Sequence, residues 1–231
     1  MANYGVPGSG FFSADSGVSL PPVPLDQPKN LYRFGEQTIW STQFLAATVG
    51  IANNTFRTFA TPQGQNGQGF APMSIGETNL KEGGRIPSGV AYDVFGIACH
   101  VAAATTNANI ALPIDTDALI GDLLNIQTNG ILTWDFTQTQ VDIAPIVLVG
   151  AGGGAFGAVG GTNATPIGHM NNGAGSVWMY RKYPVALPGN STFSILLRFG
   201  NGAPAISGGA GTGIAVKVVL LGYYKNIVEI G

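Results

Sequence analysis

The sequence is poor in charged residues and has no cluster of basic ones. Lys and Arg together number 10 and Asp and Glu 12 in 231 residues, and no run of Lys or Arg occurs. Long solvent-exposed helices need many charged side chains, so we do not expect them to dominate the fold. A protein that grips a nucleic-acid backbone concentrates Lys and Arg on its surface. We therefore expect no direct sequence-specific binding of nucleic acid.

Cysteine and histidine are also scarce. Cys99 is the only cysteine, and residues 1–5 lack the basic start of a secretory signal, which together indicate folding in a reducing cytoplasm. The only histidines are His100 and His169. Cys99 and His100 are neighbours on a predicted strand, so their side chains should face opposite ways and cannot share a metal ion. With no G-x-S-x-G motif present, we expect no catalytic residues, no metal site and no cofactor.

No hydrophobic run suited to a membrane span is present. The longest uncharged stretch, residues 143–180, is rich in glycine and is interrupted by Pro145 and Pro166. A spanning helix needs about 20 mostly apolar residues that can stay helical. We therefore expect no membrane-spanning helix.

Glycine and proline, by contrast, are abundant. The 35 Gly and 14 Pro make 49 turn-forming positions, and 45% of the residues are hydrophobic, enough for a sizeable core. Short apolar or alternating runs recur between the Gly-rich turns, which predicts an all-β sandwich or barrel of about eight strands. The predicted strands are 38–44, 55–59, 90–101, 131–139, 141–149, 176–183, 192–199 and 214–228.

Two of these strands carry a more detailed prediction. In 55–59, alternation places Phe56, Thr58 and the following Ala60 on one face and Arg57 and Phe59 on the other. The 90–101 strand is apolar on both faces towards its end, which indicates burial between two layers.

One short helix is predicted after Asp115. Asp115 or Thr116 can cap its first turn, Asp117 suits the helix dipole there, and Leu123 and Ile126 fall at helical spacing before an end near Asn125. Asp115, Asp117 and Asp122 form the densest carboxylate group in the sequence. Their spacing lacks the glycine and terminal glutamate of a calcium loop, so we interpret them as helix-capping residues.

Residues Gly152–Gly157 match the G-x-G-x-x-G pattern of dinucleotide-binding proteins. That pattern requires a helix after its last glycine, and it requires an acidic residue about 20 positions later to hold the ribose. Residues 158–163 are poor helix formers, and no acid occurs between Asp142 and Glu229. We therefore expect a flexible loop between strands here.

The chain is predicted to divide into an extended N-terminal arm, residues 1–30, and one domain, residues 31–231. The arm is rich in Gly and Pro, which favour extended geometry, yet it carries the apolar residues Phe11, Phe12 and Leu20. A solvated tail does not need such side chains, so we expect the arm to lie on a neighbouring surface, although a disordered tail is the alternative.

Charge is unevenly distributed along the chain. Residues 1–142 hold 11 acids and 5 bases, a net charge of −6, whereas residues 143–231 hold 1 acid and 5 bases, a net charge of +4. Copies of the chain could therefore attract one another head to tail.

Several segments resemble one family in their order along the chain. They are the polar lead-in 77–87 before the 92–101 strand, the helix after Asp115, the apolar strand 132–136, the proline-bounded approach 183–193 and the closing strand 216–224. This order is similar to that of the jelly-roll major capsid proteins of tailless icosahedral bacterial and archaeal viruses, in particular those that contain a membrane.

The resemblance implies a single jelly-roll β-sandwich, since 231 residues are too few for a double one. It implies a structural subunit, without enzymatic activity, that self-assembles into capsomers of a virus shell. Its partners would be copies of itself, minor capsid or vertex proteins, and an internal membrane beneath the shell. Its location would be the virion, after synthesis in the host cytoplasm.

Two other classes fit parts of the same pattern. A trimeric jelly-roll binding module, lectin-like or tumour-necrosis-factor-like, would have similar strands, although such modules act mostly outside cells. A β-sandwich enzyme such as a cupin needs a cluster of histidines, which two histidines cannot form.

Overall fold

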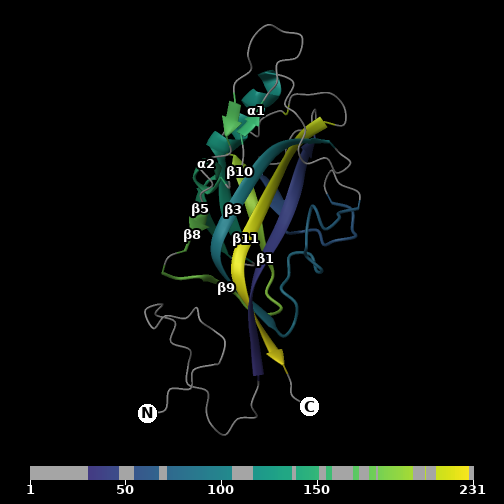
Figure 1. Ribbon diagram of the computed structural model, residues 1–231, viewed down its shortest axis with the longest axis vertical. Coiled ribbons are helices and arrows are strands. Elements are labelled where there is room, and N and C mark those ends of the chain that lie inside the picture. The colour runs from purple at the N-terminus through teal and green to yellow at the C-terminus, as the bar shows by residue number, and fades with distance from the viewer. Residues whose placement is uncertain are drawn as a thin grey trace.

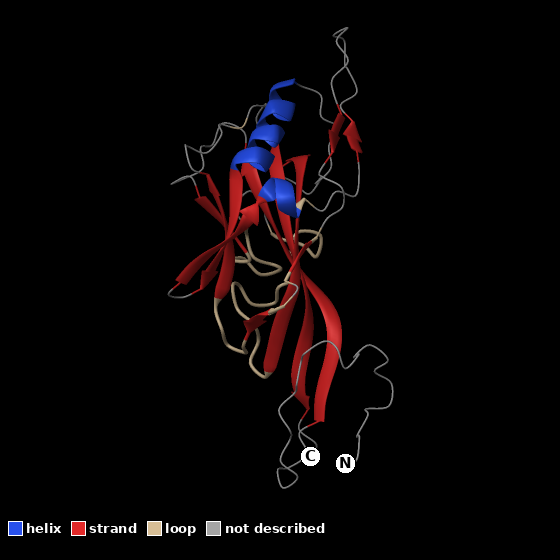
Figure 2. Ribbon diagram, turned by 90° about the vertical axis from the view of Figure 1, so that its left-hand side faces the viewer, coloured by secondary structure: helices blue, strands red, loops and turns tan. Residues whose placement is uncertain are grey.

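The computed structural model describes residues 31–46, 55–67, 72–105, 117–136, 139–150, 155–157, 169–171, 177–180, 182–199, 206 and 212–228. Strands dominate this part of the chain, and the helices gather at one end of the sheets (Figure 1; Figure 2). The predicted all-β class is therefore confirmed. The predicted arm, residues 1–30, lies outside the described residues.

Sheet A is antiparallel and has five strands (Figure 1). Its order is β1 (Leu31–Ala46), β11 (Thr212–Val228), β3 (Val90–Thr105) and then β8 (Trp178–Met179), and β9 (Val185–Leu187) also pairs with β3. β11 thus lies between β1 and β3, and it pairs with β1 along 16 residues.

Sheet B has four antiparallel strands. Its order is β2 (Thr55–Thr58), β10 (Phe193–Phe199), β4 (Gly130–Phe136) and β5 (Thr139–Pro145). A separate hairpin joins β6 (Ala155–Gly157) to β7 (His169–Asn171), and the two helices are α1 (Asp117–Asn129) and α2 (Ile146–Val149).

The strand pairs of the two sheets are nested in the sequence. β1 pairs with β11, β2 with β10, β3 with β8 and β9, and β4 with β5. The first strand therefore pairs with the last, the second with the next to last, and so on inwards. Each pair is closer in sequence than the one that encloses it.

One hydrophobic core lies between the two sheets. Alternate residues of both sheets fill it, because successive side chains of a strand point to opposite faces. They include Leu132 and Trp134 of β4, Ile195 and Leu197 of β10, and Ile214, Val216, Val218 and Leu220 of β11. Leu123 and Ile126 of α1 join this core, and their helical spacing places both on the same face of the helix.

A second, smaller cluster lies on the other face of sheet A. Met73 packs there against Phe44, Ala104 and Ala215, and all four side chains are buried. This cluster covers Ala104 of β3. Further along the strand, Ile97, Ala98 and Cys99 are consecutive and each is at most 5% exposed, so β3 is buried on both faces. The predicted burial of this strand between layers is confirmed.

Met73 belongs to a segment, residues 72–80, that we call the strap and that closes the β1 edge of sheet A. The Asn79 side chain accepts a hydrogen bond from Trp40 N at 2.9 Å and donates one to Thr38 O at 2.8 Å. The Trp40 indole N–H donates to Ile75 O at 2.9 Å. The strap thus satisfies backbone groups that an edge strand would otherwise leave open.

The predicted boundaries of several elements were wrong. The strand predicted over 38–44 extends over Leu31–Ala46, and the one predicted over 131–139 ends at Phe136. The strand predicted over 141–149 ends at Pro145, and residues 146–149 form the helical turn α2. The strand predicted over 176–183 is paired only at Trp178–Met179. The helix continues four residues beyond the predicted end at Asn125, to Asn129.

Phe59 is also placed differently from the prediction. Strand β2 ends at Thr58, and Phe59 adopts a left-handed backbone with φ of 65°. This turn directs the Phe59 side chain into the core, where it is completely buried, and not to the outer face. Its ring packs against that of Phe193, with 5.6 Å between the ring centroids. The Phe59 N–H donates to Ser41 Oγ at 2.9 Å, which ties the end of β2 to β1.

Candidate functional site

Cys99 and His100 lie side by side on β3 and face opposite ways, as predicted. Cys99 is 1% exposed in the main core, and burial raises its pKa to about 12. A thiol with that pKa is protonated at neutral pH and is a poor nucleophile. His100 is half-buried on the other face, where burial and then the charge of Lys217 lower its pKa.

His100 belongs to a row of polar residues that crosses sheet A beneath the strap. Lys217 of β11 pairs directly with His100 of β3 and with Thr42 of β1. Glu77 of the strap is 3% exposed, accepts a hydrogen bond from Ser74 N at 2.7 Å, and acts electrostatically on Lys217. Burial lowers the pKa of Lys217, and Glu77 partly offsets that shift.

The Gly152–Gly157 motif and His169 meet in the β6–β7 hairpin, where Gly157 pairs with His169. Gly152, Gly153 and Gly154 lie outside the described residues, but Ala155–Gly157 forms a strand, where a dinucleotide site requires the start of a helix. The prediction of a loop was therefore wrong at residues 155–157, and His169 lies in the partner strand β7.

The predicted carboxylate group is only partly described. Asp115 and Thr116 lie outside the described residues, Asp117 is the first residue of α1, and Asp122 lies within that helix. Among the residues whose structure is described, no three His, Cys, Asp or Glu side chains come close enough to hold a metal ion. None of the described helices is long and apolar enough to span a bilayer.

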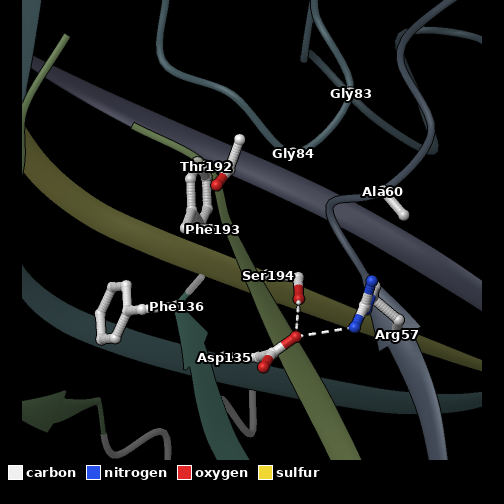
Figure 3. A pocket seen from close by; sticks show the side chains of 9 residues that line it. All are labelled: Arg57, Ala60, Gly83, Gly84, Asp135, Phe136, Thr192, Phe193 and Ser194. Atoms are coloured by element: carbon white, nitrogen blue, oxygen red, sulfur yellow. Dashed lines mark hydrogen bonds and ion pairs between the residues drawn. The ribbon is translucent and has the colours of Figure 1, made fainter. Parts of the chain in front are cut away.

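A hollow lies on the outer face of sheet B (Figure 3). This groove has a volume of about 450 Å³. Strands β2, β4 and β10 supply Arg57, Asp135, Phe136, Phe193 and Ser194, while Ala60, Gly83, Gly84 and Thr192 lie at the ends of adjoining turns. The neighbours of Arg57, Asp135 and Ser194 in sequence face the core. Because successive side chains of a strand point to opposite faces, these three polar side chains point outwards into the groove.

Asp135 lies at the centre of the groove, and neighbouring side chains already bond to both oxygens of its carboxylate. Arg57 Nη2 lies 2.7 Å from Asp135 Oδ2, and Ser194 Oγ donates to the same oxygen at 3.1 Å (Figure 3). Gln140 Nε2 donates to Oδ1 at 3.3 Å. Ser194 thus donates to a carboxylate that Arg57 already binds, and the residues that line the groove include no histidine that could take up a proton from its hydroxyl.

The groove presents a partly open guanidinium to solvent. The Arg57 side chain is 57% exposed, which leaves some of its five N–H donors open to solvent. A second exposed ion pair lies on the same face, where Arg198 Nη1 is 3.3 Å from Asp142 Oδ1. The two pairs make this face of sheet B polar but electrically balanced.

Sequence reasoning missed the groove and the polar row beneath the strap. Arg57 and Asp135 are 78 positions apart, and Ser194 is 59 positions further on. A lone charged residue in an apolar strand predicts an outward-facing side chain, so Asp135 could have been placed on the outer face. Its partner could not, because pairing between distant strands leaves no local signal.

Comparison with models of known protein families and with curated proteins finds no match to this chain.

Proposed function

We propose that the described strands form a single jelly roll. A jelly roll can be viewed as a long hairpin of four strand pairs, wound so that its pairs contribute to two packed sheets. Counting β8 and β9 as one interrupted strand, the chain has eight main strands, and they pair first with eighth, second with seventh, third with sixth and fourth with fifth. This nested order supports the jelly roll, with the β6–β7 hairpin as an insertion.

On this fold we further propose a structural role, as the major capsid subunit of an icosahedral virus shell. The nested strand order is the observation that carries the proposal, because it agrees with the family that the sequence resembles. The partners would be copies of the chain, minor capsid or vertex proteins and an underlying membrane, and the location would be the virion.

The outer face of sheet B has properties that suit such a subunit. A shell subunit must bury large areas against neighbours, and an unpaired charge in such a contact is costly. Arg57 is paired with Asp135, and Arg198 with Asp142. A neighbour can therefore cover this face without leaving any of these four charges alone.

Electron microscopy of the purified protein tests the proposal. Negative-stain images of the concentrated protein should show closed, uniform particles or the capsomers that build them. Light scattering at micromolar concentration should give the mass of several chains. A protein that stays monomeric at high concentration and in high salt would contradict a shell role.

A trimeric binding module is the second candidate, and the groove at Arg57 is the feature that favours it. Such a module would form discrete trimers and no larger particles in the same images. It would also bind a small polar ligand in the groove, and Arg57→Ala would abolish that binding.

A further inference from the structure

Four of the nine exposed large apolar side chains among the described residues lie on one side of the molecule. Val141 of β5, Val147 and Leu148 of α2, and Met179 of β8 are each 48–57% exposed. These three elements lie together along one side of the two sheets (Figure 1). We call this surface, formed by residues 139–149 and 177–180, the β5–α2–β8 side. Clustered exposed apolar side chains, unlike scattered ones, mark a contact surface.

The apolar residues of α2 are held in place by a well-anchored turn. Ile146 and Val149 are at most 1% exposed in the core, so Val147 and Leu148 must point outwards. Directly after α2, Gly150 forms a bridge with Cys99 of β3. The turn therefore connects the edge of sheet B to the edge of sheet A, and it presents two apolar side chains on a fixed support.

The edge of sheet A at β1 and the edge of sheet B at β5 differ in how they are covered. On the β1 side, the strap bonds to the edge strand through Asn79 and Ile75. On the other side, no strand or bridge within the described part of the chain pairs with the outer edge of β5. An uncovered edge next to apolar side chains is the kind of surface that another chain covers in an assembly.

Charges of opposite sign flank the apolar centre. Asp142 of β5 lies on the sheet B edge, and its side chain is 64% exposed even though Arg198 lies 3.3 Å away. Lys182, which is exposed, lies just past Tyr180, whose N–H still bonds to Phe95 O of sheet A. A two-fold axis parallel to the strands would bring the sheet B edge of one copy against the sheet A edge of the other. The edge that carries Asp142 would then lie against the edge that carries Lys182.

From these observations we infer that the β5–α2–β8 side is the contact surface for a second copy of this chain, with α2 at its centre. The inference deepens the proposed assembly function by assigning a surface to it. A nucleic acid or an anionic membrane would require a larger cluster of basic residues here, whereas the sequence of residues 139–149 and 177–184 contains two, Arg181 and Lys182.

Cysteine cross-linking tests the surface directly, because Cys99 is buried and contributes little background. Leu148→Cys places a thiol at the proposed centre, and Ile75→Cys is the matched control, since Ile75 is 56% exposed on the strap side. Under mild oxidation at micromolar concentration, Leu148→Cys should form a covalent dimer at least about ten-fold faster than Ile75→Cys, because association raises the effective thiol concentration. Equal rates would overturn the inference.

A charge-introducing variant provides the complementary measurement. Val147→Asp combined with Leu148→Asp should weaken self-association, measured by analytical ultracentrifugation, by about a hundred-fold, because it buries unpaired carboxylates in the contact. Ile75→Asp should leave association unchanged. Circular dichroism of both variants should match the unmodified protein, as all three side chains are exposed. Self-association that survives the double change would overturn the inference.

These outcomes are distinguishable from the failure of the proposed function. If microscopy shows shells but Leu148→Cys does not cross-link preferentially, the assigned surface is wrong and the shell role stands. If Leu148→Cys cross-links preferentially but no particles form, the surface stands and the shell role is wrong.

Discussion

Replacing Thr42 with valine should stabilise the protein. Thr42 lies in β1 and is fully buried, and its Oγ1 is the one buried side-chain polar atom among the described residues that has no hydrogen-bond partner. Valine has nearly the same shape, suits a strand, and puts a methyl group where the hydroxyl was. A buried polar group without a partner costs about 1–3 kcal/mol. Thr42→Val should therefore raise the free energy of unfolding by about that amount.

Thr58→Val is the matched control for this change. Thr58 is also buried in a strand, at 1% exposure, but its Oγ1 donates to Ile195 O at 2.9 Å. The same chemical replacement there removes a satisfied hydrogen bond, which contributes about 0.5–1.5 kcal/mol. Thr58→Val should therefore lower the free energy of unfolding, so the two variants should shift stability in opposite directions.

Urea denaturation of the dissociated protein measures both effects. The transition midpoint should rise for Thr42→Val and fall for Thr58→Val, with the slope of the transition unchanged in each. If Thr42→Val destabilises the protein as much as Thr58→Val does, the Thr42 hydroxyl has a partner, such as a buried water that bridges to Lys217. Our account of the polar row beneath the strap would then be wrong.

Four further outcomes are expected. Tyr92→Phe should lower the free energy of unfolding by about 1–2 kcal/mol, measured by thermal denaturation, because the buried hydroxyl loses its bond to Leu220 O. Gly213→Ala should prevent folding or strongly reduce the yield of soluble protein, since its new Cβ would collide with a backbone oxygen of β1. The folded state holds the pKa of His100 below 6.5, through burial and then a neighbouring lysine, so the unfolded chain binds more protons as the pH falls through 6.5. The free energy of unfolding should therefore decrease as the pH is lowered through that window. Urea titrations should show a smaller decrease for His100→Gln. Deleting residues 1–30 should leave the melting temperature nearly unchanged but block assembly seen by light scattering.

Each of these has a clear contrary result. Unchanged stability in Tyr92→Phe would mean that the hydroxyl is not a structural donor, and a normally folding Gly213→Ala would mean that β1 and β11 separate more easily than their pairing indicates. An unchanged pH slope in His100→Gln would mean that another group governs the acid response. Normal assembly without residues 1–30 would make them a passive tail.

The strands of the core could be predicted from the sequence because their signal is local. In β10, the apolar residues Phe193, Ile195 and Leu197 alternate with residues of the outer face, and this alternation is visible in the sequence itself. β3 was also predictable, because an apolar run on both faces can exist only where both faces are covered. The cover itself, Met73 of the strap, gave no such signal.

Other features depend on contacts between distant segments. α2 has the apolar sequence Ile-Val-Leu-Val, which is as suited to a strand as to a helix, and its turn follows from the need to connect the two sheet edges. Phe59 departs from the strand geometry of β2 because its ring packs in the core beside Phe193. The groove likewise arises only when β2, β4 and β10 are adjacent.

The position of β11 between β1 and β3 constrains how the chain reaches its folded state. Leu31 pairs with Val228, so the two strands of the longest ladder are almost the whole chain apart. During synthesis on the ribosome, β1 and β3 cannot pair with β11, which lies between them, until residues 212–228 have emerged. Closing so long a loop before any pairing is gained is entropically unfavourable, and folds of this kind are slow. The apolar strands made first thus stay exposed longest, and at high expression they are the segments that a chaperone must shield from aggregation.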